Sequence, residues 1–271
     1  MSERIAFIGG GNMASAILGG LIKQGLPPHL IDVVEPEAQA RDKLISSFSV
    51  SACAEPGAFL RDAALIVWAV KPQTFREAAH QMRAFGQNAL HLSVAAGIRS
   101  DSIAQWLGTE RVVRAMPNTP ALIGQGITAL FARPAVTPAD KAQVNQVITP
   151  TGELLWLDAE AQLDAVTALS GSGPAYMFYF MEAMTTAGTE MGLTAPQAHQ
   201  LAVATFMGAG ALARASSESP KVLRERVTSK GGTTYAAITS MDENDVKGQF
   251  ISAMYAAQKR AKELGDEFGG A

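Results

Sequence analysis

A glycine-rich turn directly after an apolar run of strand length is the feature that most constrains how this chain folds. The run Ile5–Ile8 is followed by the pattern G-x-G-x-x-A over residues 9–14, and a helical segment then extends to Gln24. In such a strand–turn–helix, glycines allow the tight turn and the close approach of a pyrophosphate, which the helix dipole faces. A glycine-rich turn without a ligand is the alternative. We expect a dinucleotide site formed by Gly9, Gly10, Gly11, Asn12 and Met13.

Apolar runs alternate with helical segments through the first half of the chain. Strand-length runs separated by helices predict a parallel sheet that is covered on both faces, and right-handed crossovers then give a doubly wound, Rossmann-type α/β fold. We assign this domain to residues 1–158. After the first strand, the expected strands are Leu30–Val34, Leu65–Val70, Leu90–Ala95, Val112–Ala115, Ile127–Phe131 and Leu154–Leu157.

Long helical patterns replace the strands over residues 159–271. Pro174–Met191 is one helix, and a second is capped by Thr194 and runs to about Ala213. A shorter helix starts at Ser219, and two more segments extend to Leu264. Because these helices are rich in Ala, Met and Leu and poor in charge, we expect an all-α dimerisation domain that pairs with another copy of itself.

Composition excludes several classes of partner. The net charge is −3 and charged residues make up 17%, so we expect neither nucleic acid nor an anionic membrane as partner. Cys53 is the only cysteine, which fits a reducing cytoplasm. The start of the sequence lacks the pattern of a signal peptide, and no stretch reaches ~18 consecutive apolar residues. We therefore expect a cytoplasmic protein without a membrane span.

Glu35 closes the second predicted strand, where an acidic side chain normally binds the adenosine ribose hydroxyls. A carboxylate there favours NAD and repels the 2′-phosphate of NADP. Arg41 follows a little further on and could offset that repulsion. A solvated carboxylate at the end of a strand is the alternative interpretation of Glu35.

Three further motifs follow predicted strands, at the edge of a parallel sheet where ligands bind. The first, at residues 69–72, contains a lysine and a proline. The second, at residues 95–97, has small side chains that leave room for a flat ring. The third, at residues 117–118, belongs to a proline-flanked loop suited to presenting an amide to a nicotinamide. Each is also compatible with an ordinary loop. The cofactor-binding residues expected here are Ala69, Val70, Lys71, Pro72, Ala95, Ala96, Gly97, Pro117 and Asn118.

Two segments of the helical half carry polar groups beside helix starts. Ser172 precedes an apolar helix, where it either caps that helix or leaves free N–H groups facing a ligand; from this segment alone we favour capping. Around Gly231 and Gly232, successive N–H groups at a helix start form a nest suited to a carboxylate. A plain linker between helices is the alternative there.

Motifs for metal binding are absent from the sequence, which has neither C-x-x-C nor H-E-x-x-H. We expect no metal site. The histidines are scattered and not flanked by acids, so we interpret all four as surface or packing residues: His29, His80, His91 and His199.

Taken together, the motifs resemble the pyrroline-5-carboxylate reductase family. They occur in the family's order along nearly the whole chain: IGGGNMA, AVKP, SVAAGI, RAMPNTP, SGSGPAY and VTSKGGTT. The last is close to the family signature, which usually reads S-P-G-G-T-T, with Lys230 in place of the proline. Six ordered motifs are far more specific than the glycine turn alone.

The resemblance implies a Rossmann domain, a helical dimerisation domain, and dimers that assemble further into a decamer. It implies NADPH as the usual cofactor, and Glu35, in place of the small polar residue often found there, makes NADH a second candidate. It also implies that a turn from the partner subunit binds the substrate carboxylate and that Thr234, as the catalytic residue, bonds the ring nitrogen. The substrate-binding residues implied are Ser172, Ser229, Gly231, Gly232, Thr233 and Thr234.

The expected reaction is hydride transfer from NAD(P)H to the imine carbon of 1-pyrroline-5-carboxylate, which gives L-proline in the last step of proline biosynthesis. Another imine reductase or a β-hydroxyacid-dehydrogenase-like oxidoreductase is the alternative. Alcohol oxidation needs a base, and such dehydrogenases carry a lysine on the long helix, yet no lysine lies between Ser170 and Pro220. A nucleotide-sensing protein without enzymatic activity is a second alternative, and it would not need the nest around Gly231.

Overall fold

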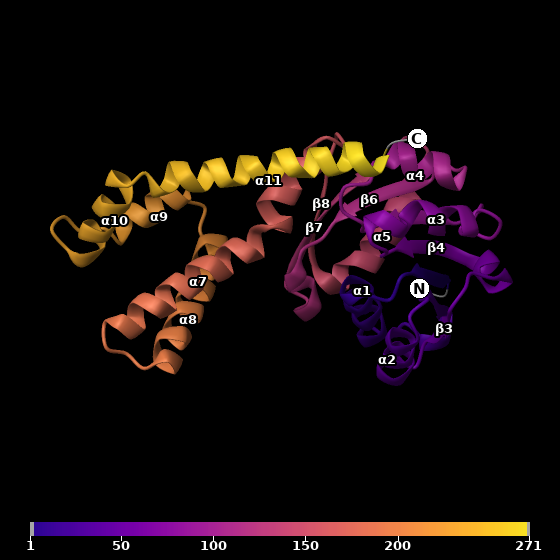
Figure 1. Ribbon diagram of the computed structural model, residues 1–271, viewed down its shortest axis with the longest axis horizontal. Coiled ribbons are helices and arrows are strands. Elements are labelled where there is room, and N and C mark those ends of the chain that lie inside the picture. The colour runs from indigo at the N-terminus through magenta and orange to yellow at the C-terminus, as the bar shows by residue number, and fades with distance from the viewer. Residues whose placement is uncertain (1–2, 270–271) are drawn as a thin grey trace. The chain divides into compact units, whose positions relative to one another are not determined.

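One eight-stranded sheet organises the first part of the chain in the computed structural model, which describes residues 3–269 (Figure 1). The strands lie in the order β3-β2-β1-β4-β5-β6-β7-β8, so the chain builds one side of β1 first and then the other. This confirms the doubly wound, Rossmann-type arrangement. The strands are β1 (Arg4–Ile8), β2 (Ile31–Val34), β3 (Ser51–Cys53), β4 (Ala63–Trp68), β5 (Leu90–Ser93), β6 (Val112–Met116), β7 (Gly126–Ala132) and β8 (Gly152–Trp156).

Helices cover both faces of this sheet, because side chains alternate between two apolar cores along each strand. One core contains side chains of α1 (Asn12–Lys23), α2 (Ala38–Phe48) and α5 (Pro138–Ile148). The other contains side chains of α3 (Pro72–Met82) and α4 (Ser100–Leu107). Strands buried on both faces explain why their sequences are almost continuously apolar.

Strand direction departs from the predicted parallel sheet at β7. Strands β1 to β6 are parallel, but β7 runs antiparallel to β6, and β8 is parallel to β7. Only the short 3-10 helix η3 (Thr119–Ile123) stands between β6 and β7. A parallel return needs a crossover of about a dozen residues or more, so this short link reverses the chain.

A reciprocal pair of hydrogen bonds caps the start of α5. The Thr137 hydroxyl accepts a hydrogen bond from the Asp140 N–H at 3.1 Å, and the Asp140 carboxylate accepts one from the Thr137 N–H at 2.9 Å. This reciprocal pair satisfies two donors that the helix leaves unpaired. Arg111 also bonds the Asp140 carboxylate at 2.7 Å.

From the end of β8 to residue 269, all regular elements are helices. The predicted cap at Thr194 precedes α8, and the helix predicted to start at Ser219 is α9, with Ser219 as its cap. The elements are α6 (Gln162–Val166), the π-helix η5 (Thr167–Gly171), α7 (Gly173–Glu190), α8 (Ala195–Ala215), α9 (Pro220–Arg226), α10 (Thr233–Glu243) and α11 (Val246–Gly269).

The expected helix cap at Ser172 is wrong. Ser172 has helical backbone angles (φ −84°, ψ −16°), and its N–H bonds the Thr167 carbonyl at 2.8 Å in the wide spacing of a π-helix. The helical path therefore passes through η5 into α7 without a cap. A π-helix has no sequence signature as strong as that of a cap, and such turns are frequent at functional sites.

Contacts divide the chain into two compact units, each of which is described separately below. The Rossmann unit extends to Ser172 and includes the segment from Ala257 onward, and the helical unit is Gly173–Ala256. The domain boundary predicted after residue 158 stays a prediction, since packing units and domains need not coincide. Between residues 3 and 269, no helix combines the length and apolar character that crossing a membrane requires.

Candidate functional site

The glycine turn joins β1 to α1 and has no room for a side chain at its first residue. Gly9 has φ +93°, and a Cβ added there would lie 2.6 Å from the Ala69 carbonyl oxygen. Gly11 precedes α1 directly, and an added Cβ would meet no atom within 4 Å. The turn is therefore tight at its start and open in front of the first helical turn, where Asn12 and Met13 lie. Unpaired N–H groups at such a helix start attract phosphate.

A hollow of about 500 Å³ lies beside this turn at the carboxyl ends of β1, β2 and β4. It is partly open, and helix α3 contributes Thr74, Glu77 and Gln81, which the sequence analysis did not single out. A helix face after a proline gives no sequence signal for ligand contact. The predicted cofactor-binding residues that line this hollow are Gly9, Gly11, Glu35, Ala69, Val70 and Lys71.

Glu35 is held against the glycine turn. One carboxylate oxygen accepts from the Gly10 N–H at 2.7 Å, and the other accepts from the Glu37 N–H at 2.9 Å. An added Cβ on Gly10 would collide with Leu44 and approach Glu35, so glycine is required there as well. The carboxylate is thus fixed at the edge of the hollow, with acceptor capacity left for ribose hydroxyls.

Arg41 does not pair with the Glu35 carboxylate. Its guanidinium donates to the backbone carbonyls of Glu35 at 2.8 Å and Pro36 at 2.6 Å. Glu35, Glu37 and Glu77 line the hollow, whereas Lys71 is its only basic lining residue among those described. The lining of the hollow therefore carries an excess of negative charge.

The remaining predicted cofactor residues are not among those that line this hollow; they lie in the glycine turn, at the neighbouring strand ends, or in the first turns of α1 and α3. Ala95 is buried, and Gly97 has φ +75° in the loop after β5. Asn118 follows β6, and its side-chain oxygen accepts from the Ile127 N–H at 3.0 Å, while its NH₂ group can donate to a ligand. These other predicted residues are Gly10, Asn12, Met13, Pro72, Ala95, Ala96, Gly97, Pro117 and Asn118.

Strand β6 is held by a partly buried ion pair. Arg114 of β6, 8% exposed, donates to the Glu160 carboxylate at 2.6 Å. Glu160 also accepts from the Ser100 N–H and hydroxyl at 2.6 and 2.5 Å. Arg114 therefore has a structural role, tying β6 to the start of α4. An added Cβ on Gly171 would overlap Met116, so η5 meets the end of β6 within the Rossmann unit.

In the helical unit, a tight turn precedes α10. The Gly232 N–H bonds the Ser229 carbonyl at 3.0 Å, and Gly231 has φ +76° while Lys230 has negative φ. This is the pattern of a type II turn, which requires glycine at its third position and favours proline at its second, where Lys230 lies. Gly232 then leads directly into α10.

The turn leaves a group of donors exposed. The side chains of Ser229, Lys230, Thr233 and Thr234 are exposed, and within residues 3–269 their polar ends form no hydrogen bond or ion pair. First-turn N–H groups of α10 point in the direction of the positive end of the helix dipole. Such a cluster suits a carboxylate, and it contains no acidic side chain to oppose one.

The only histidine that is deeply buried among the described residues packs in the sheet. Trp68 Nε1 donates to Nδ1 of His91 at 3.0 Å, and Nε2 of His91 lies 2.9 Å from the Gly86 carbonyl. Burial lowers the pKa of His91 to about 4, the Gly86 carbonyl opposes this, and the charge of Arg111 adds to it. His91 is thus a neutral packing residue. Across residues 3–269, no group of His, Cys, Asp or Glu side chains is arranged to hold a metal ion.

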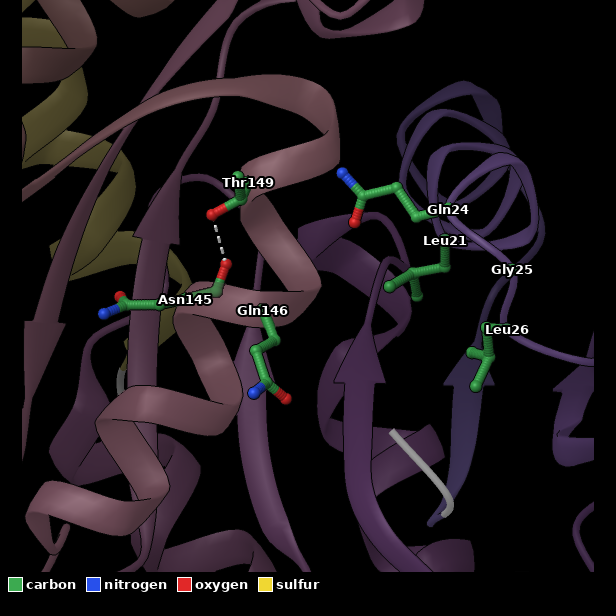
Figure 2. A pocket seen from close by; sticks show the side chains of 7 residues that line it. All are labelled: Leu21, Gln24, Gly25, Leu26, Asn145, Gln146 and Thr149. Atoms are coloured by element: carbon green, nitrogen blue, oxygen red, sulfur yellow. Dashed lines mark hydrogen bonds between the residues drawn. The ribbon is translucent and has the colours of Figure 1, made fainter.

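A second hollow, of about 390 Å³, lies at the other end of α1. Figure 2 shows Gln24 and Gln146 beside it and the Thr149 hydroxyl donating to the Asn145 carbonyl, at 2.7 Å. The hollow has no titratable lining residue and lies by the amino edge of the sheet, opposite the edge where α/β proteins bind ligands. We assign no chemistry to it.

Comparison with known proteins finds family and sequence matches over nearly the whole chain. Residues 160–264 match a family described as pyrroline-5-carboxylate reductase dimerisation, and residues 4–97 match one described as NADP oxidoreductase, coenzyme F420-dependent. A pyrroline-5-carboxylate reductase of Pseudomonas aeruginosa is 44% identical over 270 residues, which are 99% of each chain.

Solved structures extend this agreement to the fold. A pyrroline-5-carboxylate reductase from Coxiella burnetii aligns with a TM-score of 0.90 at 36% identity, over 97% of this chain and 99% of that one. A Plasmodium falciparum pyrroline carboxylate reductase with NADP bound aligns with a TM-score of 0.88 at 26% identity, over 97% and 98% of the two chains.

Proposed function

This chain belongs to the pyrroline-5-carboxylate reductase family, and we propose that it reduces 1-pyrroline-5-carboxylate to L-proline with a nicotinamide cofactor. The observation that carries the proposal is the 44% identity to a curated reductase across 99% of both chains. The two candidate sites agree with it, because one suits a dinucleotide and the other suits a carboxylate.

The dinucleotide fits the Rossmann unit on physical grounds. Gly9 and Gly11 leave backbone and space for a pyrophosphate, and the hollow beside them continues along β2 and α3. When bound, the cofactor supplies the hydride. The protein's part is to hold the nicotinamide at the ends of β4 to β6, where we place Ala95, Ala96 and Asn118.

The cofactor preference follows from the charge around Glu35. A carboxylate fixed beside the glycine turn accepts hydrogen bonds from ribose hydroxyls but repels a 2′-phosphate, and Arg41 is engaged with backbone carbonyls. NADPH is the family's usual cofactor, and the Plasmodium relative was solved with NADP. We therefore propose that both cofactors are used, with Glu35 reducing the family's preference for NADPH.

We assign the substrate to the turn before α10. The backbone of Ser229, Gly231 and Gly232 would bind the substrate carboxylate, aided by Thr233, with Ser172 as a further contact. The Thr234 hydroxyl would bond the ring nitrogen and keep its proton in place while the adjacent carbon accepts the hydride. An imine carbon is already electrophilic, so orientation and exclusion of water can supply most of the acceleration without a charged acid.

Assembly is part of this proposal. Large apolar side chains of the helical unit are exposed, among them Phe178 at 63% and Tyr179 at 70%. A second copy covering them would bury apolar area, in accord with the dimerisation family matched over residues 160–264. We propose a homodimer in which each substrate turn serves the partner's cofactor, a further decamer of such dimers, and a cytoplasmic location.

A cofactor-oxidation assay tests the function. Loss of reduced-nicotinamide absorbance, with L-proline formed in equal amount, is expected on adding 1-pyrroline-5-carboxylate. Oxidation of β-hydroxy acids with NAD or NADP is expected to be absent, because α7 and α8 carry no lysine to serve as base. Cofactor binding without turnover of any imine would favour a nucleotide sensor and overturn the proposal.

A further inference from the structure

The last turns of α11 pack on the loop that follows β5. The segment of α11 from Ala257 onward belongs to the Rossmann unit, although the helix starts at Val246 in the helical unit. The loop Val94–Arg99 joins β5 to α4 at the carboxyl edge of the sheet. This is the loop to which the proposed function assigns a place beside the nicotinamide.

Backbone approaches backbone at this contact. Gly97 has φ +75°, and a Cβ added to it would lie 3.0 Å from the Leu264 Cβ. Gly265 is buried, and a Cβ added there would lie 3.3 Å from Arg99 Nε and 3.7 Å from the Gly97 oxygen. The loop and the helix are therefore in close contact, with little room for larger side chains.

Polar and apolar contacts fix the ends of the same interface. Arg99 pairs with Asp266 at 2.5 Å, and the Ser102 hydroxyl donates to the Gly269 carbonyl at 3.0 Å. The Phe268 ring packs against the apolar core that includes Ala95. These contacts place the final turn of α11 against the end of the loop and the start of α4.

The loop has few hydrogen bonds of its own. In the described part of the chain, the Val94 N–H bonds the Trp68 carbonyl and the Ala95 N–H bonds the Ser93 hydroxyl, both at the start of the loop. No comparable bond is made by the N–H groups of Ala96 and Gly97 within residues 3–269. The middle of the loop is therefore held by its contact with α11 and by the side chain of Ile98, which is buried in the neighbouring apolar core.

We propose that the end of α11, Leu264–Gly269, is a positioning element for the cofactor. It holds the loop after β5 in the conformation that receives the nicotinamide. The inference rests on the proposed function. The match to the dimerisation family ends at residue 264, and Gly265, Asp266 and Phe268 lie beyond it.

Two neighbouring acids of α11 give a matched test. Asp266 pairs with Arg99 of the loop, whereas Glu267 pairs with Arg260 of the same helix. In the full-length protein, Asp266→Ala is expected to raise the cofactor Kd about threefold, as loss of one exposed ion pair allows, and Phe268→Ala to raise it about tenfold. Glu267→Ala and Phe268→Leu are expected to leave it unchanged.

The measurements are fluorescence titration of the reduced cofactor without substrate, and kcat and both KM values with it. A positioning role predicts a higher Kd and KM for the cofactor, with the imine KM, kcat at saturation and dimer mass unchanged. Equal cofactor Kd values in Asp266→Ala and Glu267→Ala would overturn the inference, as would parallel changes in every parameter. If Phe268→Ala does not fold, the Asp266 and Glu267 pair decides alone. A wild-type protein that binds no nicotinamide dinucleotide would refute the proposed function instead.

Discussion

Replacing His91 with glutamine is expected to flatten the loss of stability of this protein in mild acid. His91 is 1% exposed in β5, and both ring nitrogens are engaged: Nδ1 accepts from Trp68, and Nε2 faces the Gly86 carbonyl. Protonation of Nδ1 would place two donors opposite each other and put a charge into an apolar core. Both effects favour the neutral ring, in line with a pKa lowered to about 4.

The sign and size of the change in the free energy of unfolding follow from the difference in proton binding between the folded and unfolded states. Above pH 6.5 the ring is neutral in both the folded and unfolded states, so this group gives no pH dependence. Below pH 6.5, His91 binds a proton in the unfolded chain, whereas in the folded chain it stays neutral down to about pH 4. At about 1.4 kcal/mol per pH unit, the free energy of unfolding falls by about 3 kcal/mol over that window.

Urea unfolding at about pH 7 and about pH 4.5, at one fixed protein concentration, measures this loss. His91→Gln keeps a donor and an acceptor, and we expect it to lower stability at neutral pH but to remove most of the histidine's contribution to the slope. His80→Gln, at an exposed position of α3, is the control and should keep the wild-type slope. A His91→Gln protein with the full wild-type slope would refute the assignment of the acid sensitivity to this ring.

Four further outcomes are expected. Glu35→Ser should raise kcat/KM for NADPH relative to NADH about tenfold, less at high salt; an unchanged ratio would show that Glu35 does not face the ribose. Thr234→Ala should lower kcat about tenfold, through a hydrogen bond worth ~1–2 kcal/mol, and unchanged turnover in a folded variant would remove Thr234 from the mechanism. Lys230→Pro should raise the free energy of unfolding by ~0.4–1 kcal/mol in urea titrations, because proline suits the second position of its turn; lower stability would contradict that turn type. Light scattering at falling concentration should reveal no stable, active monomer, and finding one would contradict an obligate dimer.

Sequence reasoning succeeded where structure is local. The strands β1, β2, β4, β5 and β6 were predictable because each is an apolar run buried on both faces, and α5 because Thr137 and Asp140 form its cap within one turn. Strand β3 gave no such signal, since its residues are mostly exposed at the edge of the sheet.

Features that depend on distant partners were not predictable. The direction of β7 is set by the length of a loop, and the π-helix η5 replaced the expected cap at Ser172. The sequence marked Glu35 as a ribose ligand, but its bond to the Gly10 N–H depends on the register between β1 and β2. That register also decides which way the carboxylate faces.

The contrast between local and distant features also explains why the sequence could indicate two candidate binding turns but not their arrangement in space. The glycine turn of residues 9–11 and the turn before α10 are each local, so a few adjacent residues encode their backbone angles and free N–H groups. Hydride transfer requires two reacting atoms in contact, and in the proposed function these atoms are held by two turns that lie far apart in the sequence. Residues such as Asp266 act on it at a distance, through the loop they hold, and no short motif records such an effect.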